Sequence, residues 1–277
     1  MKALTLAVVL TLVSAISFGS PTKGKYFDRV IFVVFENTSY ATAIQQPFFT
    51  KLATSGANFT NFTALTHPSQ GNYIALTSGD TEGVTNDNQY DLNVSNVVDL
   101  LEAKGITWKV YAESFPENCF QGMKSGNYYR KHNPFMSFVD IQNNPARCSH
   151  IVNAQKFSSD LQNGDLPEYI FYVPDIQNDG HNTGVTYADA WYGKTFGPLL
   201  NDSRLMDNAI LISTFDEGSS GPKNQIYTSI VGPAVNPGNY ADNLTTPSLL
   251  RLVEENWNLG DLGKLDASAT PITNIWK

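Results

Sequence analysis

Two pairs of oxygen-bearing side chains could bind a divalent cation together. The first pair is Glu36-Asn37 and the second is Asp216-Glu217, and each follows an apolar, β-branched run, at residues 30–35 and 209–215. Such runs are typical of strands buried on both faces, and an open α/β sheet places its active site where such strands end. Either pair by itself would be interpreted as a solvated strand end. Two pairs in one chain predict a shared site for one ion, and oxygen ligands favour Mg²⁺, Ca²⁺ or Mn²⁺.

Ser69 is a candidate nucleophile. It lies between His67-Pro68 and a predicted helix at residues 70–77. From spacing alone, its hydroxyl is expected to cap that helix. The same position also favours chemistry, because free N–H groups and the positive end of a helix dipole bind phosphate. A serine beside a divalent cation could lose its proton there and attack phosphorus.

Candidates for proton transfer and charge neutralisation lie in two loops. His181, in the sequence Asp-Gly-His-Asn after a predicted strand, could act as a general acid, and a structural histidine is the alternative. Lys131 and His132 could neutralise the charge of a substrate, although a solvated basic face fits the sequence equally well. His67 and His150 are expected to be structural.

Strands and helices alternate along the chain. Strands are predicted at residues 30–35, 106–112, 169–173, 209–215 and 226–231, and helices at residues 41–55, 70–77, 95–104, 154–163, 187–201 and 247–257. This order indicates an α/β fold with a mostly parallel central sheet flanked by helices. Residues 114–151 lack regular patterning, and a loop of that length inside a compact domain is usually functional. With no repeat or linker, residues 20–277 are expected to form a single domain.

The N-terminus predicts export. Residues 1–19 contain Lys2, an apolar run and small closing residues, as in a secretory signal peptide. The apolar run is too short to span a bilayer, and no later segment is long enough for stable membrane insertion. The net charge is −8, or −9 without Lys2, which argues against nucleic acid or an anionic membrane as a partner. The oligomeric state is left open.

An exported chain also favours a disulfide and glycans. Cys119 and Cys148 are the two cysteines of the chain, and their pairing would contribute about 3 kcal/mol. A reactive free thiol is the alternative. Sequons for N-glycosylation occur at Asn37, Asn58, Asn61, Asn93, Asn201 and Asn243. The sequon at Asn37 should stay empty if that side chain binds a metal.

Six segments of the chain match those of a known family in the same order, namely VIFVVFENTSY, THPSQGNYIALTSGDT, YRKHNPF, NDGH, TFDE and SLLRLVEENWNLGDLG. This resemblance is to the phosphoesterase family, which contains secreted fungal acid phosphatases and bacterial phospholipases C. It covers nearly the whole mature chain, is closest to the acid phosphatases, and implies an alkaline-phosphatase-like fold. Two positions depart from the family pattern. Gly71 replaces a frequent proline, and Thr246-Pro247-Ser248 replaces a frequent His-Tyr-Ser.

The resemblance also implies roles for single residues. Ser69 matches the nucleophile that becomes phosphorylated. The family's metal ligands are matched by Glu36, Asn37, Asp216 and Glu217. Asn72 matches a position that contacts phosphate. His132 and His181 match active-site histidines.

Together these features predict a secreted, metal-dependent acid phosphatase that hydrolyses small phosphate monoesters through a phosphoserine. A phosphodiesterase or phospholipase C that uses the same site is the first alternative. A secreted binding protein without turnover is the second.

Overall fold

A computed structural model describes residues 22–219 and 223–277. The signal peptide predicted at residues 1–19 lies outside these ranges. No helix in the described part of the chain is both long and apolar enough to cross a membrane.

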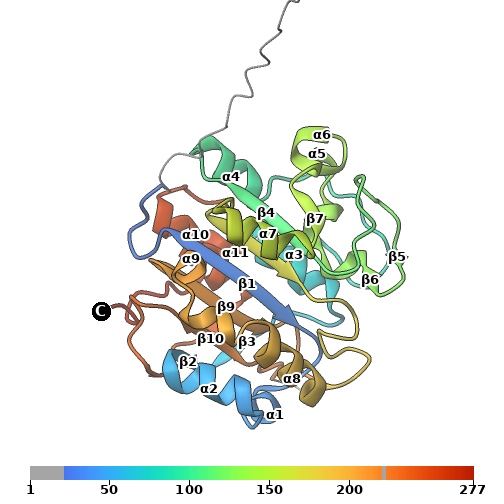
Figure 1. The fold of residues 1–277 in the computed structure, drawn as a ribbon. Helices are drawn as coiled ribbons and strands as arrows, with labels where there is room; N and C mark the ends of the chain where they lie inside the picture. The colour runs from blue at the N-terminus through green and yellow to red at the C-terminus, as the bar shows by residue number, and fades with distance from the viewer. Residues whose placement is uncertain (1–21, 220–222) are drawn as a thin grey trace, which may run out of the picture.

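An eight-stranded sheet forms the centre of the molecule (Figure 1). Its strand order is β11-β2-β10-β9-β1-β8-β4-β7. The strands β7, β4, β8, β1 and β9 run parallel, whereas β10 is antiparallel to both of its neighbours. The mostly parallel α/β sheet predicted from the sequence is therefore confirmed. The bounds are β1 (Arg29–Phe35), β2 (Ala57–Phe59), β4 (Trp108–Ala112), β7 (Ile151–Asn153), β8 (Tyr169–Val173), β9 (Ala209–Phe215), β10 (Thr228–Val231) and β11 (Gly238–Tyr240).

Helices cover both faces of this sheet. On one face α2 packs against α8 and α7 packs against α9, and on the other α3 packs against α10 (Figure 1). The α-helices are α1 (Tyr40–Ala43), α2 (Pro47–Ser55), α3 (Gln70–Ser78), α4 (Val97–Ala103), α5 (Val139–Gln142), α6 (Pro145–Cys148), α7 (Lys156–Asn163), α8 (Val185–Thr195), α9 (Ser203–Met206), α10 (Thr246–Trp257) and α11 (Leu265–Ser268). Short 3₁₀ helices are η1 (Arg130–His132), η2 (Pro134–Ser137) and η3 (Pro198–Asn201).

Strand β1 sets the position of the site. Six of its seven residues are buried, as expected for a strand covered on both faces. It pairs along its whole length with β9, so that Phe35 lies opposite Phe215. The backbone N–H of Asp216 donates to the carbonyl of Phe35 at 2.9 Å. The residues that follow the two strands therefore emerge side by side at one edge of the sheet.

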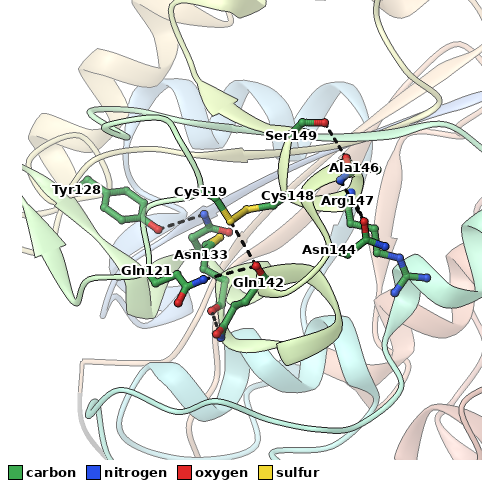
Figure 2. The surroundings of a disulfide bond; sticks show 11 residues. Cys119, Gln121, Tyr128, Asn133, Gln142, Asn144, Ala146, Arg147, Cys148 and Ser149 are labelled. Atoms are coloured by element: carbon green, nitrogen blue, oxygen red, sulfur yellow. Dashed lines mark hydrogen bonds between the residues drawn. A yellow bond between two sulfur atoms is a disulfide. The ribbon is translucent and has the colours of Figure 1, made fainter.

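The segment of residues 114–151 is ordered by short elements. It contains η1, η2, α5, α6 and a hairpin of β5 (Lys124–Ser125) and β6 (Tyr128–Tyr129). The predicted disulfide is confirmed, because Cys119 and Cys148 are bonded with their Cα atoms 5.7 Å apart (Figure 2). A second small sheet pairs β3 (Phe62–Thr63) with β12 (Leu244–Thr245) elsewhere in the fold.

The sequons differ in accessibility. Asn58 is buried, and its amide donates to Tyr40 and Asn239, so that it has no room for a glycan. The exposed acceptor asparagines are Asn61, Asn93, Asn201 and Asn243. Glycosylation at these four positions stays a prediction.

Candidate active site

The hydroxyl of Ser69 lies at the start of α3 and points away from the helix. Ser69 Oγ donates to Glu36 Oε2 at 3.0 Å and lies 3.5 Å from Asn37 Oδ1. It makes no capping bond to the helix, and its backbone is already helical, with φ −39° and ψ −54°. The Ser69 hydroxyl therefore does not cap the helix, which was one of the two interpretations of this residue. Its hydroxyl is held buried against a carboxylate.

The ends of β1 and β9 bring two carboxylates to the same place. Asn37, whose φ of 52° turns the chain sharply after β1, donates its backbone N–H to Asp216 Oδ1 at 2.9 Å. The other oxygen, Asp216 Oδ2, is buried and has no hydrogen-bond partner within the described ranges. Burial and the nearby charge of Glu36 raise the pKa of Asp216 well above its ordinary value. Two buried carboxylates in this position call for a positive charge between or beside them.

Glu36 also connects Ser69 to a buried tyrosine and histidine. Its second oxygen, Oε1, accepts the hydroxyl of Tyr73 at 2.5 Å and lies 3.3 Å from His132 Nε2. His132 Nδ1 in turn lies 2.9 Å from Asp179 Oδ2. Burial lowers the pKa of His132 to about 4, and burial raises the pKa of Asp179 to about 7. His132 is therefore neutral above about pH 5, and one of its ring nitrogens faces Glu36 without a hydrogen bond.

The residues around Ser69 fit a divalent cation. Asp216 Oδ2 and His132 Nε2 are both buried and lack hydrogen-bond partners among the described residues, as expected of atoms that a cation would satisfy. Glu36, His132 and Asp179 offer ligand atoms that all lie within 4.8 Å of one another. This group shares only Glu36 with the four ligands predicted from the sequence. From the sequence, His132 is predicted to take part in catalysis and is not predicted to be a metal ligand.

The four predicted oxygen ligands are placed unequally. Glu36 and Asn37 face Ser69 Oγ, and Asp216 is tied to Asn37. Glu217 directs its carboxylate to His67, with Oε2 2.5 Å from Nδ1 of the histidine. Burial raises the pKa of Glu217, while His67 acts in the opposite direction. His67, which the sequence placed in a structural role, thus contacts a predicted ligand.

The carboxylate of Asp87 occupies the N-terminal end of α3, where an anion would bind. Asp87 Oδ1 accepts the first helical N–H, that of Gln70, at 3.1 Å, and Asp87 Oδ2 lies 2.8 Å from Lys131 Nζ. Burial lowers the pKa of Lys131, but Glu36 and Asp87 outweigh that effect and the pKa is raised. The ammonium stays charged and feels the carboxylates of the site. Lys131 therefore faces the site and does not point into bulk solvent.

The two remaining predicted residues lie at different depths. The side chain of His181 is exposed, and its ring centroid is 6.0 Å from that of His132. Its backbone N–H donates to Asp179 Oδ1 at 2.7 Å, which holds it at the mouth of the site. Asn72 is buried, and its amide bonds to the backbone of Leu65 and Thr66 at 2.9 to 3.1 Å. In this structure Asn72 therefore holds the loop that precedes Ser69.

Three functional candidates were missed from the sequence. Tyr73 lies one helical turn after Ser69 on the same face of α3, a spacing that could have identified it. Asp179 lies two residues before His181, within a motif that had been noted for its histidine. Asp87 lies in a polar loop at residues 80–94 and carries no local signal.

Comparisons with known proteins identify the family. The phosphoesterase family model matches residues 32–260. A probable acid phosphatase of Kluyveromyces lactis is 37% identical over 92% of this chain and 66% of its own length. An acid phosphatase of Aspergillus fumigatus is 38% identical over 90% of this chain and 59% of its own length. The chain thus spans less than two thirds of the length of these two relatives.

The solved structures agree on the fold. A protein of the alkaline phosphatase superfamily from Vibrio parahaemolyticus is similar in structure, with a TM-score of 0.60 at 16% sequence identity. The match covers 91% of this chain and 72% of the Vibrio chain. This likeness supports the alkaline-phosphatase-like architecture expected from the sequence. With the family match over most of its length, the chain belongs to the phosphoesterase family.

Proposed function

We propose that this protein is a secreted, metal-dependent acid phosphatase that hydrolyses phosphate monoesters through a phosphoserine intermediate. The observation that carries the proposal is the buried hydroxyl of Ser69, which leaves the start of α3 and donates to Glu36. A serine in this position is held for attack on a phosphate bound at the helix terminus.

In the first step, Ser69 Oγ forms a bond to phosphorus as the ester bond to the leaving oxygen breaks. The proton of the Ser69 hydroxyl points at Glu36 Oε2, which is the nearest acceptor. Lys131 and the N–H of Gln70 balance the charge of the phosphate oxygens once Asp87 has moved aside. His181, exposed at the mouth of the site, donates a proton to the leaving oxygen.

In the second step, water attacks the phosphoserine from the side that the alcohol has left. The oxygen of Ser69 regains a proton as inorganic phosphate departs. Deprotonated His181 takes a proton from the attacking water, which reverses its role in the first step. Asn72 takes part by holding the loop before Ser69, and Tyr73 fixes the carboxylate of Glu36 through its hydroxyl.

The metal site completes this arrangement. Glu36, Asn37, Asp216 and Glu217 would hold one Mg²⁺, Ca²⁺ or Mn²⁺ beside Ser69. The group of Glu36, His132 and Asp179 is the alternative set of ligands around the same glutamate. A cation held there supplies positive charge that lowers the pKa of the serine hydroxyl and stabilises the transferring phosphoryl group.

One assay tests the proposal. The full chain, purified from a secreting host, is incubated with 4-nitrophenyl phosphate and with bis(4-nitrophenyl) phosphate, before and after chelation and with Mg²⁺, Ca²⁺ or Mn²⁺ restored. We expect hydrolysis of the monoester, loss of that activity with chelator and recovery with metal. Faster hydrolysis of the diester would favour the phosphodiesterase alternative, and no hydrolysis of either would favour a binding protein.

A further inference from the structure

A cavity of ≈340 Å³ adjoins the site and has no role in the steps above. Its walls include Gln70, Asp87 and Lys131. These are the three residues joined at the N-terminus of α3, where the phosphate is proposed to bind. A monoester bound there would extend its organic group from Ser69 into this cavity.

The hairpin of β5 and β6 gives the cavity an apolar wall. Met123, which precedes the hairpin, lines the cavity and keeps 52% of its surface exposed, although large apolar side chains are usually buried. Tyr129 of β6 also lines it. The Tyr129 ring is stacked on His132, with ring centroids 6.2 Å apart, so that its orientation is fixed by a residue of the site.

A positive charge lies at the same wall. Lys124 Nζ is 5.8 Å from the centroid of the Tyr129 ring, and Lys124 is a further lining residue. An ammonium beside an aromatic face attracts a second π-system as well as the first. A flexible thioether, an aromatic ring and an ammonium together suit a flat, electron-rich ring better than they suit a hydroxylated chain.

We propose that this cavity is a leaving-group subsite, which selects phosphate monoesters of aromatic alcohols by stacking their ring between Met123 and Tyr129. The proposal rests on the proposed function of the adjoining site. It makes the hairpin, held in the segment that the Cys119–Cys148 disulfide closes, the part of the chain that determines substrate preference (Figure 2).

The test compares phenyl phosphate with 2-naphthyl phosphate. Their alcohols are similarly acidic, so that chemistry contributes little to the difference and the size of the ring dominates. We expect a kcat/KM about tenfold higher for the naphthyl ester, mainly through a lower KM, from the additional apolar area buried. In Tyr129→Ala and in Met123→Ala this ratio should fall to about one, whereas Tyr129→Phe should keep it.

Leu265→Ala is the matched control, because Leu265 is also an exposed apolar residue but does not line the cavity. It should leave the ratio unchanged. If both esters are hydrolysed and neither alanine variant changes the ratio, the subsite is wrong while the phosphatase function stands. If neither ester is hydrolysed by the native protein, the proposed function fails first.

Discussion

Ser69 and Glu36 are joined by a hydrogen bond of 3.0 Å between the hydroxyl of the serine and Oε2 of the glutamate. The two residues are 33 positions apart and come from different elements, the start of α3 and the end of β1. The bond orients a hydroxyl that has no capping role. It therefore fixes the direction in which the buried hydroxyl of Ser69 points.

Replacing Ser69 with alanine should remove turnover. We expect kcat for 4-nitrophenyl phosphate to fall by about a thousandfold or more, because the covalent route is lost. The fold should remain intact, as judged by circular dichroism. Ser78→Ala is a suitable control, since Ser78 lies buried on the same helix and bonds only to nearby carbonyls. Normal activity of Ser69→Ala would mean that water attacks the ester directly.

Removal of the metal should destabilise the native protein more than it destabilises an Asp216→Asn variant. Without a cation, Asp216 and Glu36 are two buried acids whose charges repel, as the raised pKa of Asp216 indicates. We expect chelation at pH 7 to lower the Tm of the native protein by several degrees, and to change the Tm of Asp216→Asn much less. Differential scanning calorimetry with metal analysis by mass spectrometry checks this. Equal shifts in both proteins would place the metal elsewhere.

Replacing Asp87 with asparagine should tighten the binding of phosphate. The carboxylate of Asp87 now occupies both the N–H of Gln70 and the ammonium of Lys131. A neutral amide competes less well for these groups, so the inhibition constant of inorganic phosphate should fall about three- to tenfold. Inhibition kinetics with phosphate measures this. Weaker inhibition would show instead that Asp87 serves to hold Lys131 in place.

Replacing Glu254 with glutamine should stabilise the protein at neutral and higher pH. Glu254 is 2% exposed, and burial, together with nearby Asp266, raises its pKa from 4.5 to about 9. Between those pH values the folded state keeps a proton that the unfolded state has lost, so stability falls as the pH rises. The slope is at most about 1.4 kcal/mol for each pH unit.

Glutamine cannot lose a proton, so the stability gained by Glu254→Gln should grow from pH 5 to pH 8. Urea denaturation at several pH values measures the gain. Glu255→Gln is the control, because Glu255 forms an accessible ion pair with Arg251 and should show no such trend. A gain that did not depend on pH would mean that Glu254 is already charged at pH 5.

Loss of the disulfide should impair substrate binding as well as stability. Cys119→Ser with Cys148→Ser frees the segment that carries Lys131, His132 and the wall of the cavity. We expect a cost of about 3 kcal/mol in unfolding free energy and a several-fold higher KM at temperatures where the protein is folded. Steady-state kinetics below the unfolding transition measures the KM. An unchanged KM would show that the segment is ordered without the bond.

The parts of the site at strand ends could be predicted because local sequence determines them. The apolar runs before Glu36 and Asp216 identify buried strands, and neighbouring parallel strands bring their ends together. Ser69 could be proposed as a nucleophile but not separated from a helix cap, since both uses need the same residue at the same place. Only the direction of its hydroxyl distinguishes them.

The remaining parts depend on tertiary contacts that leave no periodic signal. Asp87 reaches Lys131 across 44 positions from a loop without apolar spacing. The helix at Val97 has Asn96 as its N-cap, whose side chain accepts the N–H of Val98, whereas the sequence predicts the helix one residue earlier, from Ser95. Both residue types are good caps, so composition could not choose between them.

The central position of β1 has a consequence for how this protein folds. β1 is the first strand of the chain, yet both of its partners lie far along the sequence, since Val30 pairs with Tyr169 on one side and with Ile210 on the other. During synthesis an apolar strand must wait for most of the chain to emerge before either edge is covered. Such long-range pairing slows folding, and until it is complete the unpaired apolar edge of the strand is prone to aggregation. We therefore expect slow refolding from denaturant, with yields that fall as the protein concentration rises.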